Sequence, residues 1–420
     1  MTLAFRAARL LASSFADLIH DGVVVIEGDR ITHVGSWESL SKTAQPPELT
    51  IRDLGNVTLM PGLFDCHVHL QLDPTNHSGG TTIDLPDDAL LTLMAKHAQR
   101  LLDAGITTAR DLGSKGQSAI HIREMIARGE IPGPRLHCAN APLTVPGGHA
   151  HALGGECQGV EGVIAEVRKR KAEGADVVKV MATGGFVTAN THPSQARFSQ
   201  EEMDAIAGEA HRLGLPVTTH ATGTEGIRRA AEAGVDSVEH CAWIGEGGRA
   251  EFDERVARRM LENGVAVCPT MNTACVEHDY FCPWDAREVI VTNLTRLRES
   301  GVTLLVGTDA GIPLCPFERY ADGITVLGDA GYSPREIIAG ATENAAAACR
   351  LAGVTGKLEV GLAADVVAFE GNPLEDLTAF GKPCFVMALG REHALSPIAS
   401  VDDQSELKAT IRERLQQGGK

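Results

Sequence analysis

Four histidines stand where their side chains could share one site. His67 and His69 are two residues apart, and side chains at i and i+2 of an extended chain point the same way. The pair therefore fits two ligands of one metal ion, the alternative being two surface or hydrogen-bonded histidines. His220 and His240 each end a short apolar run. Alone each could be a core histidine with its hydrogen bonds satisfied, but their positions at the ends of consecutive runs indicate a common site.

Two charged residues lie in runs that are too apolar for a solvated charge. Lys179 stands between Val178 and Val180, and a buried ammonium is costly unless it is paired or neutralised. One interpretation is a salt-bridged core lysine. The other is carboxylation of the amine by carbon dioxide, which gives an anionic ligand able to bridge two metal ions. Asp309 closes the run 304–309 and also needs a partner.

Together these six residues would form a mixed nitrogen and oxygen ligand set. Such a set suits zinc, with manganese, cobalt or iron as substitutes. Zinc can lower the pKa of bound water from about 15.7 to about 7, which provides hydroxide at neutral pH. We expect Asp309 to orient that hydroxide, to accept its proton and to return the proton to a leaving nitrogen.

A repeated strand and helix pattern positions these residues. Helical stretches that end in glycine alternate with eight short apolar runs, and this alternation predicts βα units with a parallel sheet. Eight such strands favour a closed (β/α)8 TIM barrel, with an open doubly wound sheet as the alternative. Barrel enzymes carry their chemistry at the carboxyl ends of the strands, where the six residues fall. The runs are 58–60, 107–110, 135–138, 177–181, 216–220, 237–240, 265–269 and 304–309.

Both ends of the sequence instead contain short strands separated by Gly, Asp and Pro turns. Closed barrels bring their ends together, so the two end segments can pair with each other. We therefore predict a small composite β-sandwich domain from residues 1–58 and 356–420, with the metal-dependent hydrolase barrel at 59–355.

Composition excludes several classes of partner. The chain of 420 residues has 38 Lys and Arg against 55 Asp and Glu, a formal net charge of −17, and no basic cluster. This balance argues against nucleic acid and an anionic membrane, and leaves a small molecule as the expected partner and a homo-oligomer open. The ten cysteines are scattered without a CxxC pair, which is typical of a reduced compartment, so we expect a cytoplasmic protein.

Taken jointly, five motifs resemble those of the amidohydrolase superfamily, and in particular the imidazolonepropionase-like branch with its metal-dependent Xaa-Pro and Xaa-Arg/Lys dipeptidases and ochratoxin-type amide hydrolases. The resemblance covers almost the whole chain. The motifs are Pro-Gly-Leu-Phe-Asp-Cys-His-Val-His at 61–69, Val-Lys-Val-Met-Ala-Thr-Gly-Gly at 178–185, Thr-His-Ala at 219–221, Val-Glu-His at 238–240 and Gly-Thr-Asp-Ala-Gly at 307–311.

The resemblance implies two divalent metal ions and a role for each polar residue. The first ion would be held by His67, His69 and Asp309, the second by His220 and His240, with carboxylated Lys179 bridging them. Pro-Gly-Gly-His at 146–149 is similar to a loop of this branch whose histidine approaches the scissile carbonyl or the substrate carboxylate. His149 would take that role, the alternative being a loop histidine that caps backbone. True imidazolonepropionases have a histidine where Lys179 stands, so Lys179 argues against that activity.

Two features bear on the substrate. Dipeptidase-like members often have an aromatic residue or histidine at the position of Thr222, where it can hold the substrate carboxylate, so the threonine weakens the case for that clamp. The segment 275–284 concentrates aromatic residues, including Tyr280, in a chain with few of them. It could wall a pocket for an apolar group, or simply pack on its own helix layer.

The leading hypothesis is a binuclear metallohydrolase that cleaves a carbon–nitrogen amide bond of a dipeptide or N-acyl amino acid by attack of a metal-bridging hydroxide. The first alternative is a hydrolase of an aryl amide, urea, cyclic amide or carboxyl ester. The second is a catalytically silent metal-binding protein.

Overall fold

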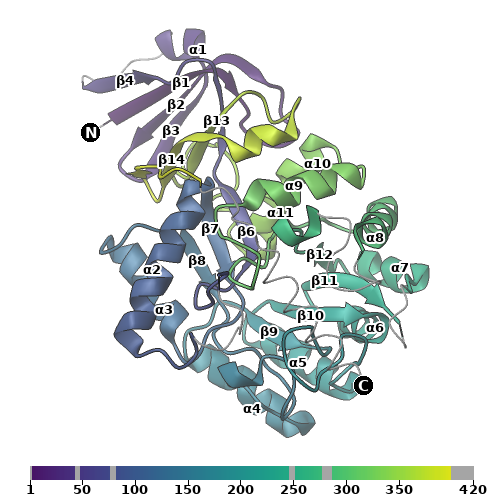
Figure 1. Cartoon of the computed structure of the whole chain (residues 1–420). Coiled ribbons are helices and arrows are strands. Elements are labelled where there is room, and N and C mark those ends of the chain that lie inside the picture. The colour runs from purple at the N-terminus through teal and green to yellow at the C-terminus, as the bar shows by residue number, and fades with distance from the viewer. Residues whose placement is uncertain (1, 43–47, 76–81, 246–250, 277–285, 399–420) are drawn as a thin grey trace.

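A computed structural model describes residues 2–42, 48–75, 82–245, 251–276 and 286–398. Two parallel sheets surrounded by helices form the larger part, and one mixed sheet built from both ends of the chain packs against it (Figure 1). Within these ranges, none of the helices combines the length and apolarity needed to cross a membrane.

The mixed sheet joins the N-terminal and C-terminal segments. Its order is β15-β14-β13-β5-β1-β2-β3, with β4 paired to β1. The two segments meet where β13 pairs antiparallel with β5, Val366 opposite Pro61 and Glu370 opposite Val57. The strands are β1 (Thr2–Leu10), β2 (Ile19–Glu27), β3 (Arg30–Ser36), β4 (Leu49–Asp53), β5 (Val57–Pro61), β13 (Val366–Glu370), β14 (Pro383–Ala388) and β15 (Arg391–His393). The short helix α1 (Trp37–Ser41) follows β3, and the 3₁₀ turn η4 (Leu377–Gly381) precedes β14.

The mixed sheet is strongly curved. Strands β14 and β1 stand three places apart in it, which would separate them by about 14 Å in a flat sheet at the usual spacing. The rings of Phe5 on β1 and Phe385 on β14 nevertheless lie 4.6 Å apart. The predicted sandwich of two separate layers is not confirmed, because these eight strands belong to one sheet.

The two parallel sheets contain β6 to β8 and β9 to β12. A helix follows each of their strands, which confirms the predicted βα repeat. The strands are β6 (Leu63–Val68), β7 (Ile106–Asp111), β8 (Arg135–Cys138), β9 (Val178–Met181), β10 (Val217–Gly223), β11 (Ser237–Ile244) and β12 (Ala266–Cys268). The helices are α2 (Asp87–Asp103), α3 (Ser118–Arg128), α4 (Gly159–Ala172), α5 (Gln200–Arg212), α6 (Thr224–Ala233), α7 (Glu254–Glu262) and α8 (Arg287–Glu299), followed by α9 (Tyr320–Asp329), α10 (Pro334–Gly340) and α11 (Glu343–Ala348). The 3₁₀ turns η1 (His151–Leu153) and η2 (Thr273–Val276) lie in loops.

Two of the eight predicted strands differ in the structure. The run 58–60 lies in β5 of the mixed sheet, and the first parallel strand is β6, which carries His67. The run 304–309 forms isolated bridges and single hydrogen bonds instead of a regular strand: Leu305 N–H donates to Val267 O at 2.7 Å, and Cys66 N–H donates to Val306 O at 2.9 Å. The structure thus confirms a parallel α/β arrangement, but not one closed eight-stranded sheet.

Strand β13 fastens the mixed sheet to the α/β part, because its side chains alternate between two cores. Val367 and Phe369 pack in one cluster with helix α2, and Val366 and Ala368 pack with Phe5 inside the mixed sheet. The side chains of both β13 faces are therefore buried, and β13 holds the two parts together.

Replacing Phe369 with Ala should lower the free energy of unfolding by about 3–5 kcal/mol, because Phe369 is fully buried and the truncation leaves a cavity between the two parts. Urea denaturation followed by circular dichroism measures the change. Phe15→Ala is the control, since Phe15 is 70% exposed and should change the value by less than about 0.5 kcal/mol. Equal effects of the two variants would contradict this account of the contact.

Candidate metal centre

The predicted site residues that the structure describes line one cavity of about 380 Å³. They come from the ends of different strands and from the loops that follow them. Tyr280 lies in 277–285, outside the described residues. The lining residues include His67, His69, His149, Lys179, His220, Thr222, His240 and Asp309.

Three of these side chains bring ligand-type atoms to one point. His67 Nε2 lies 3.3 Å from His69 Nε2, and Asp309 Oδ1 lies 3.4 Å from the first and 3.1 Å from the second. Their donor types and spacing could hold a metal ion. Asp309 Oδ1 is buried and accepts no hydrogen bond from the residues that the structure describes.

The backbone around Asp309 is held in an unusual conformation. Asp309 has φ 62°, in the left-handed region, and its N–H donates to His67 O at 2.7 Å. The buried carboxylate of Asp65 accepts from the N–H of His67 at 3.1 Å and from the N–H and hydroxyl of Thr308 at 3.0 and 2.6 Å. These bonds fix the end of β6 against the segment that carries Asp309, so backbone strain is maintained at this point.

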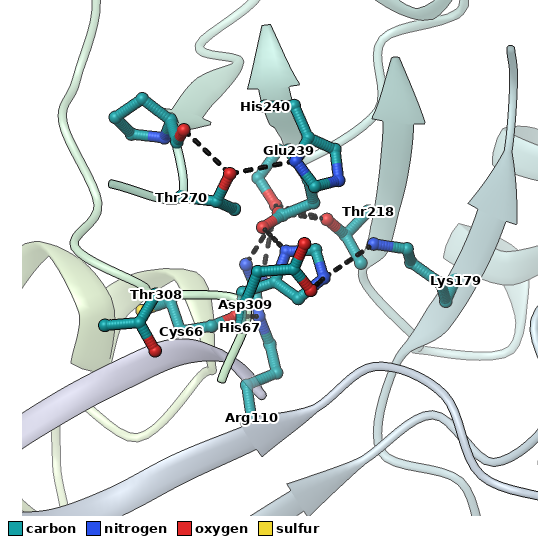
Figure 2. Close-up of polar contacts among 12 residues, drawn as sticks. Cys66, His67, Arg110, Lys179, Thr218, Glu239, His240, Thr270, Thr308 and Asp309 are labelled. Atoms are coloured by element: carbon teal, nitrogen blue, oxygen red, sulfur yellow. Dashed lines mark hydrogen bonds and ion pairs between the residues drawn. The ribbon is translucent and has the colours of Figure 1, made fainter. Parts of the chain in front are cut away.

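The other ring nitrogen of His67 bonds to a buried carboxylate. His67 Nδ1 lies 2.9 Å from Glu239 Oε2, and Arg110 Nη2 donates to Glu239 Oε1 at 2.8 Å. Thr218 and Ser237 also donate to that carboxylate, and Figure 2 shows Glu239 between His67, Arg110 and Thr218. Burial tends to raise the pKa of Glu239, but the charges of Arg110 and Lys179 outweigh it and lower that pKa. An ionised carboxylate only accepts hydrogen bonds, so His67 carries its proton on Nδ1 and has a lone pair on Nε2.

Two further imidazoles also face partners that can only accept a hydrogen bond. His69 Nδ1 lies 3.3 Å from Gly113 O, and His220 Nε2 lies 3.0 Å from Gly184 O. A carbonyl oxygen only accepts. The lone pair is therefore on Nε2 of His69 and on Nδ1 of His220.

A threonine hydroxyl determines which ring nitrogen of His240 carries the proton. The hydroxyl of Thr270 donates to Pro269 O at 2.8 Å, and His240 Nδ1 lies 2.8 Å from that hydroxyl oxygen. Because the hydroxyl proton is already engaged, His240 Nδ1 must donate, and Nε2 has the lone pair. His240 has φ 66°, and its ring centroid lies 4.4 Å from that of His220 and 5.1 Å from that of His67.

Burial favours the neutral form of these rings. It is the largest cause that lowers the pKa values of His67, His220 and His240 well below the ordinary value, and the charge of Lys179 adds to it. Neutral imidazoles with one nitrogen hydrogen-bonded to the protein are the usual form of metal ligands.

Lys179 lies on β9 with its side chain almost completely buried. Its Nζ is 3.4 Å from His67 Nε2, and within the described ranges it forms no ion pair with a carboxylate. The predicted alternative of a salt-bridged core lysine therefore finds no partner there. Burial lowers the pKa of Lys179 to about 8, although Glu239 and Asp309 act to raise it. At pH 7 about a tenth of the amine would be neutral, the form that reacts with carbon dioxide.

Thr222 and His149 lie in the same cavity wall. The Thr222 hydroxyl donates to Pro193 O at 2.7 Å, so its proton is engaged in holding the loop after β9. The ring centroid of His149 lies 4.6 Å from that of His220, and its Nδ1 lies 2.9 Å from the Thr188 hydroxyl. Burial, followed by the charge of Lys179, lowers the pKa of His149 to about 3.

We did not predict a role for Arg110, Glu239 or Asp65 from the sequence. Arg110 ends an apolar run and Glu239 stands inside one, which is the signal that singled out Lys179. Asp65 lies within the first motif, two residues before His67. A charged residue in a buried strand needs a partner, and this rule could have identified all three.

The donor set fits a metal ion. The Nε2 lone pairs of His67 and His69 and the orphaned Oδ1 of Asp309 face one another at 3.1–3.4 Å with no proton of their own between them. Such an arrangement of acceptors is unfavourable unless a cation lies among them.

Replacing Glu239 with Gln should weaken metal binding by about 10- to 100-fold, because the amide no longer fixes the proton of His67 on Nδ1. Zinc titration against a competing chelator measures the affinity. Glu225→Gln is the matched control, since that carboxylate pairs with Arg228 and Arg229 at the surface. Unchanged affinity in a folded Glu239→Gln protein would contradict the proposed role of Glu239.

Comparison with known proteins agrees with this chemistry. The chain is 29% identical to an ochratoxinase from Aspergillus niger over 429 aligned residues, covering 90% of this chain and 83% of that protein. It is 27% identical to an imidazolonepropionase from Paracoccus denitrificans, covering 86% and 90% of the two chains. A crystal structure of a Xaa-Pro dipeptidase with methionine bound in its active site is 27% identical, with a TM-score of 0.79 over 93% of this chain and 99% of that one.

These structural neighbours indicate a TIM-barrel-like α/β fold. The model of the amidohydrolase family matches residues 58–412, which is most of the chain. The ochratoxinase and the imidazolonepropionase are hydrolases that act on carbon–nitrogen bonds. The protein therefore belongs to the amidohydrolase family.

Proposed function

We propose that this protein is a binuclear metal-dependent hydrolase that cleaves an amide bond of a dipeptide or an N-acyl amino acid. The observation that supports this most strongly is the convergence of imidazole lone pairs and the orphaned Asp309 oxygen on one cavity. His67, His69 and Asp309 would hold the first ion, His220 and His240 the second, and Lys179, carboxylated on Nζ, would bridge them. Zinc is favoured by the donors, with manganese, cobalt or iron as substitutes.

Bound ions of this kind supply Lewis-acid activation of water and of a carbonyl group. The residues of the chain supply the remaining steps. Asp309 accepts a proton from the attacking water and transfers it to the amide nitrogen, so that the carbon–nitrogen bond breaks to give a carboxylic acid and an amine. His149, whose ring lies 4.6 Å from that of His220, provides a hydrogen-bond donor for the carbonyl oxygen.

The choice of a dipeptide or N-acyl amino acid rests on similarity and on the shape of the cavity. The Xaa-Pro dipeptidase is 27% identical to this chain, and a prolidase complexed with an N-methylphosphonate-L-proline is 25% identical. The cavity volume of about 380 Å³ suits a small substrate. Its apolar walls suit a large apolar side chain; they include Leu72, Leu153, Phe186, Met271, Ile290 and Leu294.

One observation favours a second candidate, an aryl amide, urea, cyclic amide or carboxyl ester. Among the described residues that line the cavity, Lys179 is the one lysine or arginine. Since Lys179 is assigned to the ions, none of these residues offers a fixed cation for a free substrate carboxylate. Thr222 does not replace it, because its hydroxyl donates to Pro193 O.

We also infer that the two parallel sheets are arcs of one (β/α)8 barrel within the predicted range 59–355, with β6 as its first strand and 304–309 as its eighth. The composite β domain predicted from 1–58 and 356–420 then also includes the end of β5. Two contacts support the barrel. The bridge between Leu143, which follows β8, and Val180 on β9 links the first parallel sheet to the second. The bridge between Val267 on β12 and Leu304 extends the second sheet toward β6.

A substrate panel tests the proposal. The zinc-loaded protein, incubated with bicarbonate, should release amine fastest from dipeptides or N-acyl amino acids with a large apolar side chain. Faster turnover of neutral aryl amides, ureas, lactams or esters would favour the second candidate. No turnover of any of them would favour a catalytically silent metal-binding protein.

Replacing Lys179 with Ala should abolish activity and leave less than a full complement of two ions, because the bridging ligand is lost. Short carboxylic acids should restore part of the activity by occupying the vacated space. Metal analysis and turnover are measured together, with Lys96→Ala on the exposed face of α2 as the control. Normal turnover of Lys179→Ala would refute the bridging role.

Replacing Asp309 with Asn should leave much of the metal bound but reduce kcat by at least about tenfold, or ~1.4 kcal/mol in the barrier, because an amide cannot accept the proton. Steady-state kinetics measure this change. Asp17→Asn, at an exposed position, should behave like the unmodified protein. A smaller loss than tenfold would show that Asp309 is not the proton acceptor.

A further inference from the structure

His149 differs from the four histidines proposed as metal ligands in the partner of its hydrogen-bonded nitrogen. His67, His69 and His220 each face a carboxylate or carbonyl oxygen, and His240 faces a threonine hydroxyl whose proton is engaged elsewhere. In each case the partner accepts from the ring nitrogen. His149 Nδ1 instead faces the hydroxyl of Thr188 at 2.9 Å, and this partner is able to donate.

The hydrogen bonds of Thr188 determine the direction of that contact. The backbone N–H of Ala150 donates to the Thr188 hydroxyl oxygen at 3.1 Å, so one lone pair of this oxygen is occupied. In the described structure, His149 Nδ1 is the acceptor available to the hydroxyl proton. If Nδ1 were protonated, the oxygen would accept twice and its own proton would be left without a protein acceptor, which costs free energy at a part-buried site. The favoured arrangement has Thr188 donating to Nδ1.

The position of the ring leaves little freedom for another arrangement. A Cβ atom placed on Gly185 would lie 2.4–2.6 Å from three atoms of the His149 ring, closer than side chains approach one another. Gly185 therefore permits the ring to lie flat against the backbone after β9. With Nδ1 held by Thr188, Nε2 is the polar atom of the ring that remains for the cavity, and it has no protein partner among the described residues.

We propose that Thr188 is a positioning residue that holds His149 in the Nε2–H tautomer, so that His149 presents a hydrogen-bond donor to the oxygen of the scissile carbonyl. This inference rests on the proposed function for the identity of the acceptor. The two threonines then have opposite effects: Thr270 fixes His240 with a lone pair on Nε2, and Thr188 fixes His149 with a proton on Nε2. One cavity thus contains metal-binding imidazoles and one donor imidazole.

The test combines nitrogen NMR with kinetics on the zinc-loaded full chain. The protein is labelled with ¹⁵N-histidine, and the resonances of residue 149 are identified by their loss in His149→Gln. Wild type and Thr188→Ser should show the proton on Nε2, whereas Thr188→Val should show a mixture or the opposite tautomer. Gly185→Ala, whose added methyl group would meet the His149 ring, should shift the same resonances.

Kinetics give the second readout. We expect Thr188→Val to lower kcat by about tenfold with little change in KM and unchanged zinc content, and Thr188→Ser to restore most of the loss. A proton on Nδ1 of His149 in wild type would overturn the proposal whatever the activity. Equal kcat for Thr188→Val and wild type would also overturn it. Absence of amide hydrolysis in wild type would instead count against the proposed function, while the tautomer is decided by NMR alone.

Discussion

The buried carboxylate of Glu239 is the interaction on which the site depends. It lies on β11 and accepts hydrogen bonds from Thr218 on β10, from Arg110 on β7 and from His67 on β6. One side chain thus ties strands of both parallel sheets together below the cavity. Because each of these groups is buried, loss of the carboxylate would leave Arg110 without its ion-pair partner and remove a hydrogen-bond acceptor from His67 and Thr218. Such a loss is far more costly than loss of a surface ion pair.

The same carboxylate also determines which nitrogen of His67 can bind a metal ion. It accepts a hydrogen bond from Nδ1–H of His67, so the lone pair of this ring is on Nε2, which faces His69 and Asp309. The rings of His69, His220 and His240 follow the same rule with backbone or hydroxyl oxygens as acceptors. The folded chain therefore concentrates lone pairs at one place, and among the described residues that line the cavity Lys179 is the one lysine or arginine. Stability and metal affinity are coupled, because the hydrogen bonds that orient the metal-binding imidazoles also connect segments of the folded chain.

The sequence predicted the six polar residues at run ends and the βα repeat, because both depend on local spacing and on the cost of burying a charge. His67 and His69 illustrate this, since two residues of extended chain suffice to align them. The partners across strands were not predictable in this way. Glu239, Arg110 and Thr218 are far apart in the sequence, and only the packing of the strands brings them together. The difference between Thr188 and Thr270 depends on which neighbour receives a hydroxyl proton, and no sequence pattern records that.

Two structural expectations were not confirmed as stated, for physical reasons. The run 58–60 favours a barrel strand because it is short and largely apolar, but β5 pairs with β1 and β13 in the mixed sheet, where all its residues are buried. The predicted sandwich became one curved sheet because β13 inserts beside β5 and continues the sheet from the N-terminal strands.

The central claim is that the converging lone pairs hold two metal ions. Anomalous diffraction at the zinc edge from crystals of the zinc-loaded protein tests it most directly. The account predicts two peaks in the cavity, one beside His67, His69 and Asp309 and the other beside His220 and His240, with extra density on Lys179 Nζ between them. A cavity without anomalous peaks, or zinc bound only elsewhere on the chain, would contradict it.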